Sequence, residues 1–586
     1  MRSLSTSLYK AVIIIALLFL FPVVQGGAVE YDDVTVTVEA PPGSEFNHGY
    51  VEYRATVENR SSSRAHEVTL SLPGTSYGND ELQVSRKVTV NANSTLRVNL
   101  FQPCYSQINE GMAVEIDGYR RSETVRLNVL RPRYSSGPWT SVLISRSMRE
   151  DDFELEDKET KTYDKKFGLM RAEVPIAEWS SNWLGYSRFD AVVVTASDFR
   201  SAPVPVKTAL WQYVECGGVL VHLGGRIEVP ETWKGNSRQE DGMMINPAGF
   251  GLCFSADNSS PQQFFQSTNH TLMEAIQNSN FPFEQRKDIE AANNAFKVVE
   301  GFEVPVRGLF VLMLAFAVLI GPVNIIVLSQ RKKRIWILWT VPLFSFLTCV
   351  AVFLYASFAE GWGAHARYEG VTLLDEKNHR ATTLGWSAFY ASLTPGNGAH
   401  FEQGTDLTIQ MSGRGYRSSG GRSVKVDWSS DQHLLYGWIV SRVPSHFMIR
   451  KSETRRERLA VQFRPDGSVA MVNGLGAPIK KVYVCKPDGQ ILRGESLAVG
   501  KEAVLTAEFS KGVSSRGAWE FRPLFVSDWL GNVSKMGNDP GSYLTPGSYL
   551  ALLDGSPFFD RGLESLATQK GESIVLGFVK QDGNEN

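Results

Sequence analysis

The chain has 586 residues, enough for several domains, and its 60 Lys and Arg residues nearly balance its 62 Asp and Glu residues, for a net charge of −2. A chain this close to neutrality gives no indication of a nucleic-acid partner. None of its five cysteines stand at Cys-x-x-Cys spacing, which argues against a zinc ribbon, a thioredoxin-type motif and a disulfide scaffold. We expect buried thiols, with one long-range disulfide as the alternative.

Residues 1–28 are arranged like a secretory signal peptide. Arg2 and Lys10 precede an apolar stretch over residues 11–24, and small residues follow at 26–28. A basic start, an apolar segment and a small-residue cleavage site define this type of targeting segment. The apolar stretch is short for a membrane span, so we expect cleavage, and an uncleaved anchor helix is the alternative. In either case the sequence predicts that the chain after this segment is exported.

Residues 29–131 are predicted to form an antiparallel β-sandwich. Runs such as "DVTVTVEA" and "HEVTLSLPG" alternate between apolar and polar residues and are bounded by Gly, Pro, Asn and Ser. This alternation, repeated at short spacing, is typical of a sandwich. The stretch "YRATVENRSSSRAHEVTLSLPG" resembles Ig-like modules of bacterial surface proteins. The resemblance implies a domain that spaces, presents or binds.

Residues 132–305 are predicted to form an α/β domain with a doubly wound parallel sheet. "FDAVVVTASDF" indicates a buried strand, and "VPVKTALWQYVECGGVLVHLGG" indicates a helix, a Gly turn and a second buried strand. Continuous apolar strands that alternate with helices are typical of such sheets, whose ligands bind at the carboxyl ends of the strands. Asp198, His222 and Arg226 stand at these predicted ends and are the candidate residues of a pocket for a small polar ligand. The alternative is structural: His222 satisfied inside the sheet and Asp198 capping a helix.

The same two stretches resemble the core of class I glutamine amidotransferase-like domains, a fold related to flavodoxin. In that family a strand–turn–helix elbow of the type G-[IV]-C-x-G carries a cysteine nucleophile. The corresponding "LVHLGG" places His222 at the nucleophile position, Cys216 precedes the strand, and no His-x-Glu pair follows. The resemblance therefore implies the fold and argues against the activity. We predict no catalytic residue, no metal and no cofactor.

Residues 306–360 are predicted to form an antiparallel transmembrane hairpin. The stretches 308–328 and 335–358 contain no charged residue, and each is about 30 Å long or more as a helix, which spans the apolar core of a bilayer. Asn324 lies two residues after Pro322 in the first span, and we expect its side chain to hydrogen-bond across the hairpin or to a partner helix. The uncharged spans argue against a transporter subunit.

The short loop between the two spans predicts the topology. It contains four consecutive basic residues, Arg331, Lys332, Lys333 and Arg334. An excess of Lys and Arg in a short loop places that loop in the cytoplasm. We therefore predict an inner (cytoplasmic) membrane protein with both large parts on the extracytoplasmic side.

Residues 361–586 are predicted to be a β-rich extracytoplasmic domain. "RPDGSVAMVNG" and "CKPDGQILRG" place Asp-Gly between β runs, which is a strong hairpin signal. No nucleophile motif follows. Asp554, Asp560 and Glu564 are spaced as turn and helix-start residues, and we expect them to be solvated rather than to bind a metal.

The complete layout resembles uncharacterised bacterial membrane proteins with a degenerate amidotransferase-like domain. Some of that group lie in gene clusters with MoxR-type AAA ATPases and von Willebrand A-domain proteins. This resemblance implies membrane or envelope protein partners and a role in assembling envelope complexes. The leading hypothesis is a non-catalytic, membrane-anchored binding or assembly protein of the bacterial envelope. The alternative is an extracytoplasmic hydrolase or carbohydrate-binding protein that uses the strand-end pocket.

Overall fold

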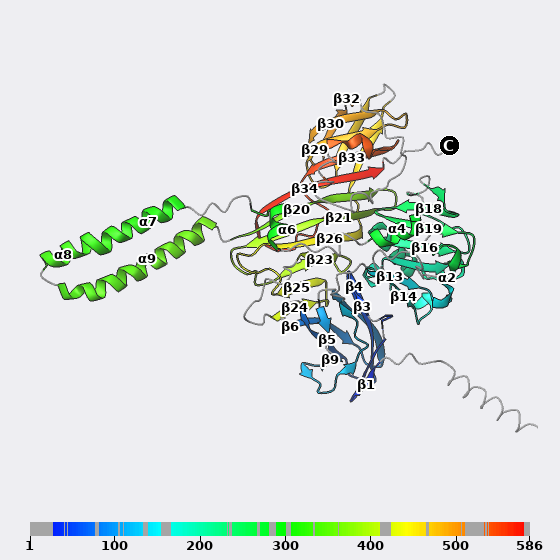
Figure 1. Ribbon diagram of the computed structural model, residues 1–586, viewed down its shortest axis with the longest axis horizontal. Helices are drawn as coiled ribbons and strands as arrows, with labels where there is room; N and C mark the ends of the chain where they lie inside the picture. The colour runs from blue at the N-terminus through cyan, green and yellow to red at the C-terminus, as the bar shows by residue number, and fades with distance from the viewer. Residues whose placement is uncertain are drawn as a thin grey trace, which may run out of the picture.

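The protein is a sheet-rich body from which one long helical hairpin projects (Figure 1). The computed structural model describes residues 27–39, 41–43, 45–76, 81–103, 106–108, 111–132, 139–153, 166–230, 233, 237–265, 270–279, 289–299, 306–331, 334–360, 363–410, 423–464, 468–505, 507–509, 533, 536 and 538–578. The predicted signal peptide, except for its last two residues, and the predicted loop residues Lys332 and Lys333 lie outside the described residues.

The first sheet of the N-terminal part has four antiparallel strands in the order β1-β2-β4-β7. Its strands are β1 (Ala28–Tyr31), β2 (Val34–Val38), β4 (Tyr50–Asn59) and β7 (Ser94–Pro103). Along β4, Tyr53, Ala55 and Val57 are buried, and the side chains between them are partly exposed. This alternation follows from the two-residue period of a strand, as the sequence pattern predicts.

The second sheet joins N-terminal strands to strands from far later in the chain. Its main path is β10-β9-β5-β6-β24-β25-β22. The strands are β5 (His66–Ser76), β6 (Glu81–Val90), β8 (Ser106–Ile108), β9 (Gly111–Ile116), β10 (Tyr119–Arg120), β11 (Val125–Arg126), β22 (Ala399–Phe401), β24 (Ser423–Asp427) and β25 (Gln432–Tyr436). β24 pairs in parallel with β6, with Val424 opposite Leu82. This sheet therefore unites the predicted ranges 29–131 and 361–586.

The α/β part has a sheet in the order β14-β13-β15-β16-β19-β18-β17. Its strands are β13 (Trp139–Ile144), β14 (Lys166–Arg171), β15 (Ala191–Thr195), β16 (Val219–Leu223), β17 (Arg238–Glu240), β18 (Met243–Ala248) and β19 (Gly251–Ala256). The first five strands of the order are parallel, and β18 and β17 extend the sheet antiparallel. Because β14 and β15 lie on opposite sides of β13, the direction of winding changes at the boundary between β13 and β15.

Helices cover both faces of this parallel sheet. α2 (Ala196–Ser201) and α3 (Val204–Glu215) follow β15, and α4 (His270–Asn278) follows later. Val192 and Val194 share a core with Leu210 of α3, whereas Val193 shares a separate core with Leu272 of α4. Successive residues of one strand thus pack on opposite helical layers, which explains why the strands are continuously apolar.

The C-terminal part is built on a nine-stranded sheet in the order β23-β26-β21-β20-β34-β33-β29-β30-β32 and a three-stranded sheet β27-β28-β31. The strands are β20 (Ala364–Asp375), β21 (Arg380–Ala391), β23 (Asp406–Gln410), β26 (Ser445–Thr454), β27 (Arg458–Phe463), β28 (Val469–Gly474), β29 (Ile479–Cys485), β30 (Ile491–Leu497), β31 (Glu502–Leu505), β32 (Ala507–Phe509), β33 (Ser548–Asp554) and β34 (Leu566–Phe578). α6 (Ile289–Ala295) packs on β26. The described residues of this part are mostly in strands, as the sequence predicts.

The helical hairpin consists of α7 (Val306–Val318), a π-helical turn η6 (Leu319–Val323), α8 (Asn324–Gln330), a 3-10 turn η7 (Arg334–Trp336) and α9 (Ile337–Glu360). Residues Phe310–Gln330 and Ile337–Leu354 are two helical stretches long and apolar enough to cross a membrane. Almost none of their side chains are buried, unlike those of a core helix. Such exposure is unfavourable in water, and it indicates a membrane association.

Two polar details shape the hairpin. Pro322 lies in the π-helical turn, where a wider turn accommodates its missing N–H. Asn324 Nδ2 donates to Thr340 Oγ1 at 2.9 Å, from α8 to α9. The prediction that Asn324 bonds across the hairpin is therefore confirmed.

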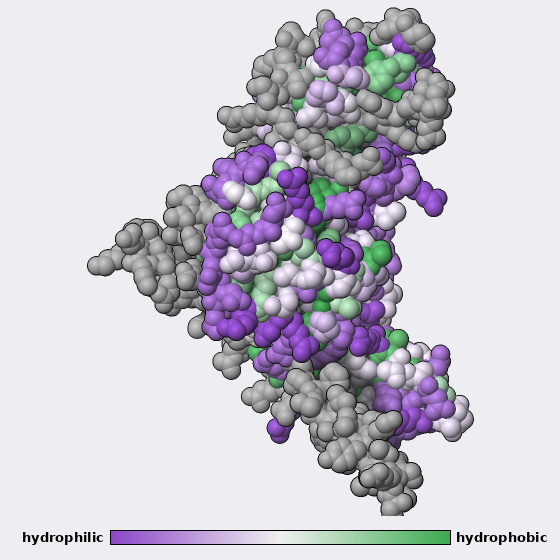
Figure 2. Space-filling model, turned by 90° about the vertical axis from the view of Figure 1, so that its right-hand side faces the viewer, coloured by the Kyte–Doolittle hydropathy of each residue, from purple (hydrophilic) through white to green (hydrophobic). Residues whose placement is uncertain are grey.

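The face of the body opposite the hairpin is of a different character. Figure 2 shows hydrophilic and intermediate residues over most of this face, with hydrophobic residues in small scattered groups. The body therefore presents a polar surface suited to water, whereas the hairpin presents an apolar surface suited to a membrane.

A buried polar junction connects the first sheet, the α/β part and strands from the C-terminal part of the chain. Arg450 on β26 pairs with Asp406 on β23 at 2.5 Å, and its Nη2 donates to the Ser187 carbonyl, which precedes β15, at 3.2 Å. Tyr50 of β4 donates its N–H to Ser187 Oγ at 3.0 Å, and its hydroxyl accepts from Gln432 at 2.7 Å. We call these five residues the three-way junction. All of them are almost completely buried.

Arg450→Met leaves the Asp406 carboxylate buried without its guanidinium. We expect the free energy of unfolding to fall by about 3–5 kcal/mol, which is the usual effect of breaking a buried pair. Urea denaturation of the detergent-solubilised chain, followed by tryptophan fluorescence, measures it.

Arg464→Met is the control, because the Arg464–Glu502 pair is exposed and such pairs contribute about 0–1 kcal/mol. The double variant R450M/D406L should recover much of the loss. Equal stability of R450M and R464M would contradict the assigned role of the junction.

Candidate functional site

Asp198 lies at the point where the winding of the parallel sheet reverses. It occupies the first turn of α2, directly after β15, and Thr195 caps this helix by accepting from the Asp198 N–H. The Asp198 carboxylate in turn accepts from Ser145 Oγ at 2.7 Å and Thr195 Oγ1 at 2.7 Å. Ser147 Oγ donates to the same oxygen. The loop after β13 and the end of β15 are thereby joined at the edge where ligands of such sheets bind.

The hydroxyl groups set the charge of this site. Burial raises the pKa of Asp198, but the hydrogen bonds from Ser147, Ser145 and Thr195 outweigh it and hold the pKa below its usual range. Asp198 is therefore an ionised acceptor at neutral pH. It is only partly buried, so a cationic or hydroxyl-bearing group can approach it from solvent.

His222 is held within β16. Its side chain is buried, its Nδ1 lies 2.9 Å from the Gly225 carbonyl, and Phe199 packs edge-on at 5.6 Å between ring centroids. Gly224, with φ +87°, makes the sharp turn that brings this carbonyl back over the strand end. Burial lowers the pKa of His222, so the ring is neutral and Nδ1–H donates to Gly225.

Asp198 follows β15, and His222 lies on the adjacent strand β16, where it is paired with Val194 of β15. Arg226 follows the same Gly turn, and its side chain is exposed. Among the described residues, no hydrogen bond or ion pair joins these three predicted site residues. Asp198 bonds to hydroxyl groups on the β13 side, and His222 bonds to its own turn.

The described cysteines of this domain are poor nucleophiles. Cys216 caps the C-terminus of α3, where Gly217 with φ +107° ends the helix, and Cys253 lies within β19. Burial raises the pKa of both thiols far above the usual range. A nucleophilic cysteine needs its thiolate, so neither residue supplies one at neutral pH.

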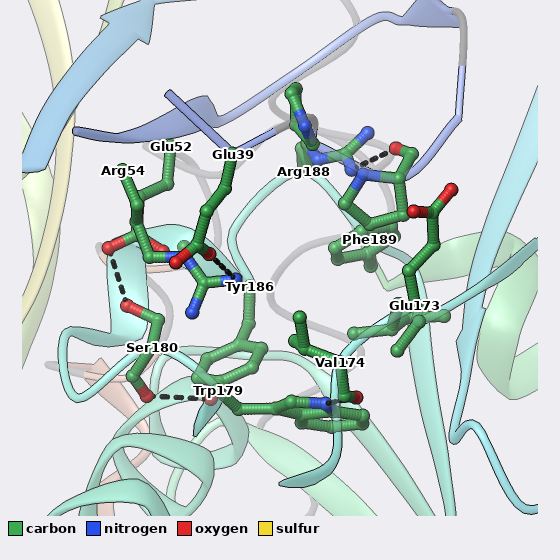
Figure 3. Close-up of a pocket in the computed structure, with 15 residues that line it drawn as sticks. Glu39, Glu52, Arg54, Glu173, Val174, Trp179, Ser180, Tyr186, Arg188 and Phe189 are labelled. Carbon is green, nitrogen blue, oxygen red and sulfur yellow. Dashed lines mark hydrogen bonds and ion pairs between the residues drawn. The ribbon is translucent and has the colours of Figure 1, made fainter. Parts of the chain in front are cut away.

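A cavity of about 90 Å³ lies where the first sheet meets the α/β part (Figure 3). The cavity is partly open to solvent. Its charged and aromatic lining residues are Glu39, Glu52, Arg54, Glu173, Trp179, Tyr186, Arg188 and Phe189. Sequence reasoning did not find this cavity, because β4 and the loop after β14 show ordinary strand and loop patterns.

Three charged groups in the cavity wall bond to different partners. Arg54 pairs with Glu39 at 2.9 Å, and Ser180 Oγ donates to Glu52 at 2.9 Å. Arg188 Nη2 donates to the Pro42 carbonyl at 2.5 Å. Figure 3 shows Glu52, Arg54 and Glu39 side by side, above the Trp179 and Tyr186 rings.

Three groups of the cavity have strongly displaced pKa values, and one of them is Tyr186, whose pKa burial raises well above its usual value. Burial raises the pKa of the Glu52 carboxyl to about 7, against the opposing effects of Arg54 and Ser180. Burial also lowers the pKa of the Arg188 guanidinium to about 9. Glu52 can therefore gain or lose a proton near neutral pH, which gives the cavity a carboxyl able to donate or to accept a hydrogen bond.

In comparisons with known proteins, no family model matches the chain, and no curated protein matches it.

Glu52→Gln should change the pH dependence of stability. Because the folded-state pKa of about 7 lies above the ordinary value of 4.5, wild-type stability falls as pH rises through this window. The glutamine of the variant does not ionise, so E52Q lacks this loss of stability at high pH. We expect E52Q to be about 1–3 kcal/mol more stable than wild type at pH 8.5, with the difference shrinking below about 0.5 kcal/mol at pH 4.5.

Urea denaturation at the two pH values measures this difference. Glu58→Gln is the matched control, since Glu58 lies on the same strand with an exposed side chain. If E52Q and wild type differ in stability by the same amount at both pH values, the pKa of the Glu52 carboxyl is not raised in the folded protein.

Proposed function

We propose that this chain is a non-catalytic binding or assembly protein of the bacterial envelope, anchored in the inner membrane by its helical hairpin. The observation that carries the proposal is the exposure of two apolar helices on a chain whose body presents a hydrophilic face. A lipid environment is the one in which both surfaces are stable together.

The arrangement of the hairpin supports a body on one side of the membrane. α7 contacts α9, the second helix of the hairpin. The start of α7 and the end of α9 lie at the end of the hairpin nearer the body (Figure 1). The opposite end contains the basic loop, with Arg331 and Arg334 at its borders. By the positive-inside rule this loop is cytoplasmic and the body extracytoplasmic.

We further propose that the α/β part is a degenerate amidotransferase-like, flavodoxin-like module that recognises a partner instead of catalysing. The strand order with the first strand between the second and the third supports this fold. The buried thiols of Cys216 and Cys253 and the neutral, sheet-bound His222 support a non-catalytic role. The ionised Asp198 and the exposed Arg226 are the side chains we assign to partner recognition. The Ig-like sandwich would space or present this module.

Co-purification tests the proposal directly. We expect the full chain, extracted from its native membrane in mild detergent, to bring down one membrane or envelope protein in a fixed molar ratio by quantitative mass spectrometry. By resemblance this would be a von Willebrand A-domain protein, alone or in a complex that contains a MoxR-type ATPase. Asp198→Ala and Arg226→Ala should each lower its recovery at least about 10-fold, which corresponds to about 1.4 kcal/mol of binding.

Glu274→Ala is the matched control, because Glu274 is an exposed carboxylate on α4 of the same module. Circular dichroism establishes that the variants are folded. A chain that elutes alone from native membranes, or a partner retained equally by D198A, would overturn the proposal.

The second candidate function is carbohydrate binding or hydrolysis on the extracytoplasmic side. The cavity favours it, because an aromatic wall of Trp179 and Tyr186 faces the titrating Glu52. Calorimetric titration with cell-wall oligosaccharides should then show binding that E52Q and Trp179→Ala weaken at least about 10-fold. If the wild-type protein gives no heat of binding, carbohydrate binding is excluded and the binding or assembly function remains.

A further inference from the structure

Two histidines and an aspartate meet at one edge of the second sheet. His400 on β22 stands directly opposite His433 on β25 in the antiparallel register. Their rings are stacked, with centroids 3.8 Å apart and planes at 21°. Asp431, just before β25, places its Oδ2 2.8 Å from His400 Nδ1. One possible ligand atom from each of the three residues lies within 4.8 Å of the others.

The chemistry of the cluster matches a transition-metal ion. Imidazole nitrogens with a carboxylate oxygen are the ligands that Zn²⁺ takes in proteins, at about 2.0–2.2 Å. In a tetrahedral site these ligand atoms lie about 3.3 Å apart, so rotation of the stacked rings about their side-chain bonds brings them into range. The two histidines stand on paired strands, and Asp431 directly precedes one of them.

Neighbouring groups orient both rings. His433 Nε2 lies 2.7 Å from the Asn397 carbonyl and donates to it, so Nδ1 is the ring nitrogen that faces no such partner among the described residues and is the one we assign to a metal ion. The Asn397 side-chain Nδ2 lies 3.4 Å from His400 Nε2 and donates to Glu564 Oε1 at 2.7 Å. A second carboxylate is thereby held beside the cluster. Hydrogen bonds that fix ring orientation are the usual outer support of metal sites.

The position of the cluster gives a bound ion a structural consequence. The His400 N–H donates to the Gly562 carbonyl at 2.7 Å, so β22 lies between β25 and the segment that contains Glu564. The side chains of His400 and Asp431 are 32% and 31% exposed, which leaves a path from solvent. An ion bound by the two histidines and also by Glu564 would link the edge of the second sheet to the segment that precedes β34.

We propose that His400, Asp431 and His433 bind one Zn²⁺ ion, with the fourth position open to water or to the nearby Glu564 carboxylate. His400 lies on β22, 31 residues before Asp431, and Asp431 and His433 lie before and on β25. The three residues form no short metal-binding motif in the sequence. This explains why the sequence analysis predicts no metal, and the proposal departs from that prediction. The site is independent of the cavity and of Asp198.

Titration calorimetry of the full detergent-solubilised chain, stripped with EDTA and without a His tag, tests the site with ZnCl₂. We expect one Zn²⁺ per chain with a dissociation constant in the micromolar range or tighter, and a rise in Tm on binding. Co²⁺ in its place should give the visible absorption of a four-coordinate ion. Asn397→Ala should weaken zinc about 10-fold, and His400→Gln or His433→Gln should weaken it more.

His365→Gln is the control, because His365 lies on β20 in the nine-stranded sheet and bonds to Thr568. It should leave zinc affinity unchanged. Circular dichroism of H400Q and H433Q without metal separates lost ligation from lost folding. Absence of stoichiometric zinc, or equal zinc binding by the double variant H400Q/H433Q, would overturn the site.

Discussion

The arrangement of the whole body depends on a buried ion pair. Arg450 and Asp406 are withdrawn from water, and such charges are stable only when each has its partner and further hydrogen bonds. Arg450 also bonds to the Ser187 carbonyl, and Tyr50 bonds to both Ser187 and Gln432. The first sheet, the α/β part and the C-terminal strands must therefore meet in one geometry. A displaced region would leave a charge or a hydroxyl unpaired in the core.

This constraint reaches the candidate binding regions. Tyr186 and Arg188, which line the cavity, are the chain neighbours of Ser187 in the junction. The junction therefore holds the α/β wall of the cavity against β4 of the first sheet. Rigidity of this kind suits a binding protein, because a pre-formed cavity and a fixed strand end lose little entropy when a partner docks.

The sequence predicts local features well and long-range partners poorly. The hairpin and the parallel strands were predictable, because both are continuous apolar runs whose environment follows from composition. The pairing of β24 with β6 was not, since alternation defines the face of a strand but not its neighbour. Glu52 stands at a polar position of the β4 alternation, and that local pattern does not reveal its hydrogen bond with Ser180 of the α/β part. The place of Asp198 after a strand end was predictable because strand ends follow from local pattern, whereas His400 and His433 are brought together only by tertiary pairing.

The central claim is that the hairpin anchors a body that lies entirely on one side of the membrane. Labelling of intact cells or spheroplasts with a membrane-impermeant maleimide tests it, with cysteine placed at Tyr119 in the body or at Arg331 in the loop, both exposed, and the parent chain as the baseline. The account predicts that Tyr119→Cys is labelled from outside and that Arg331→Cys is labelled only after lysis. Labelling of Arg331→Cys from outside, or protection of Tyr119→Cys until lysis, would contradict it.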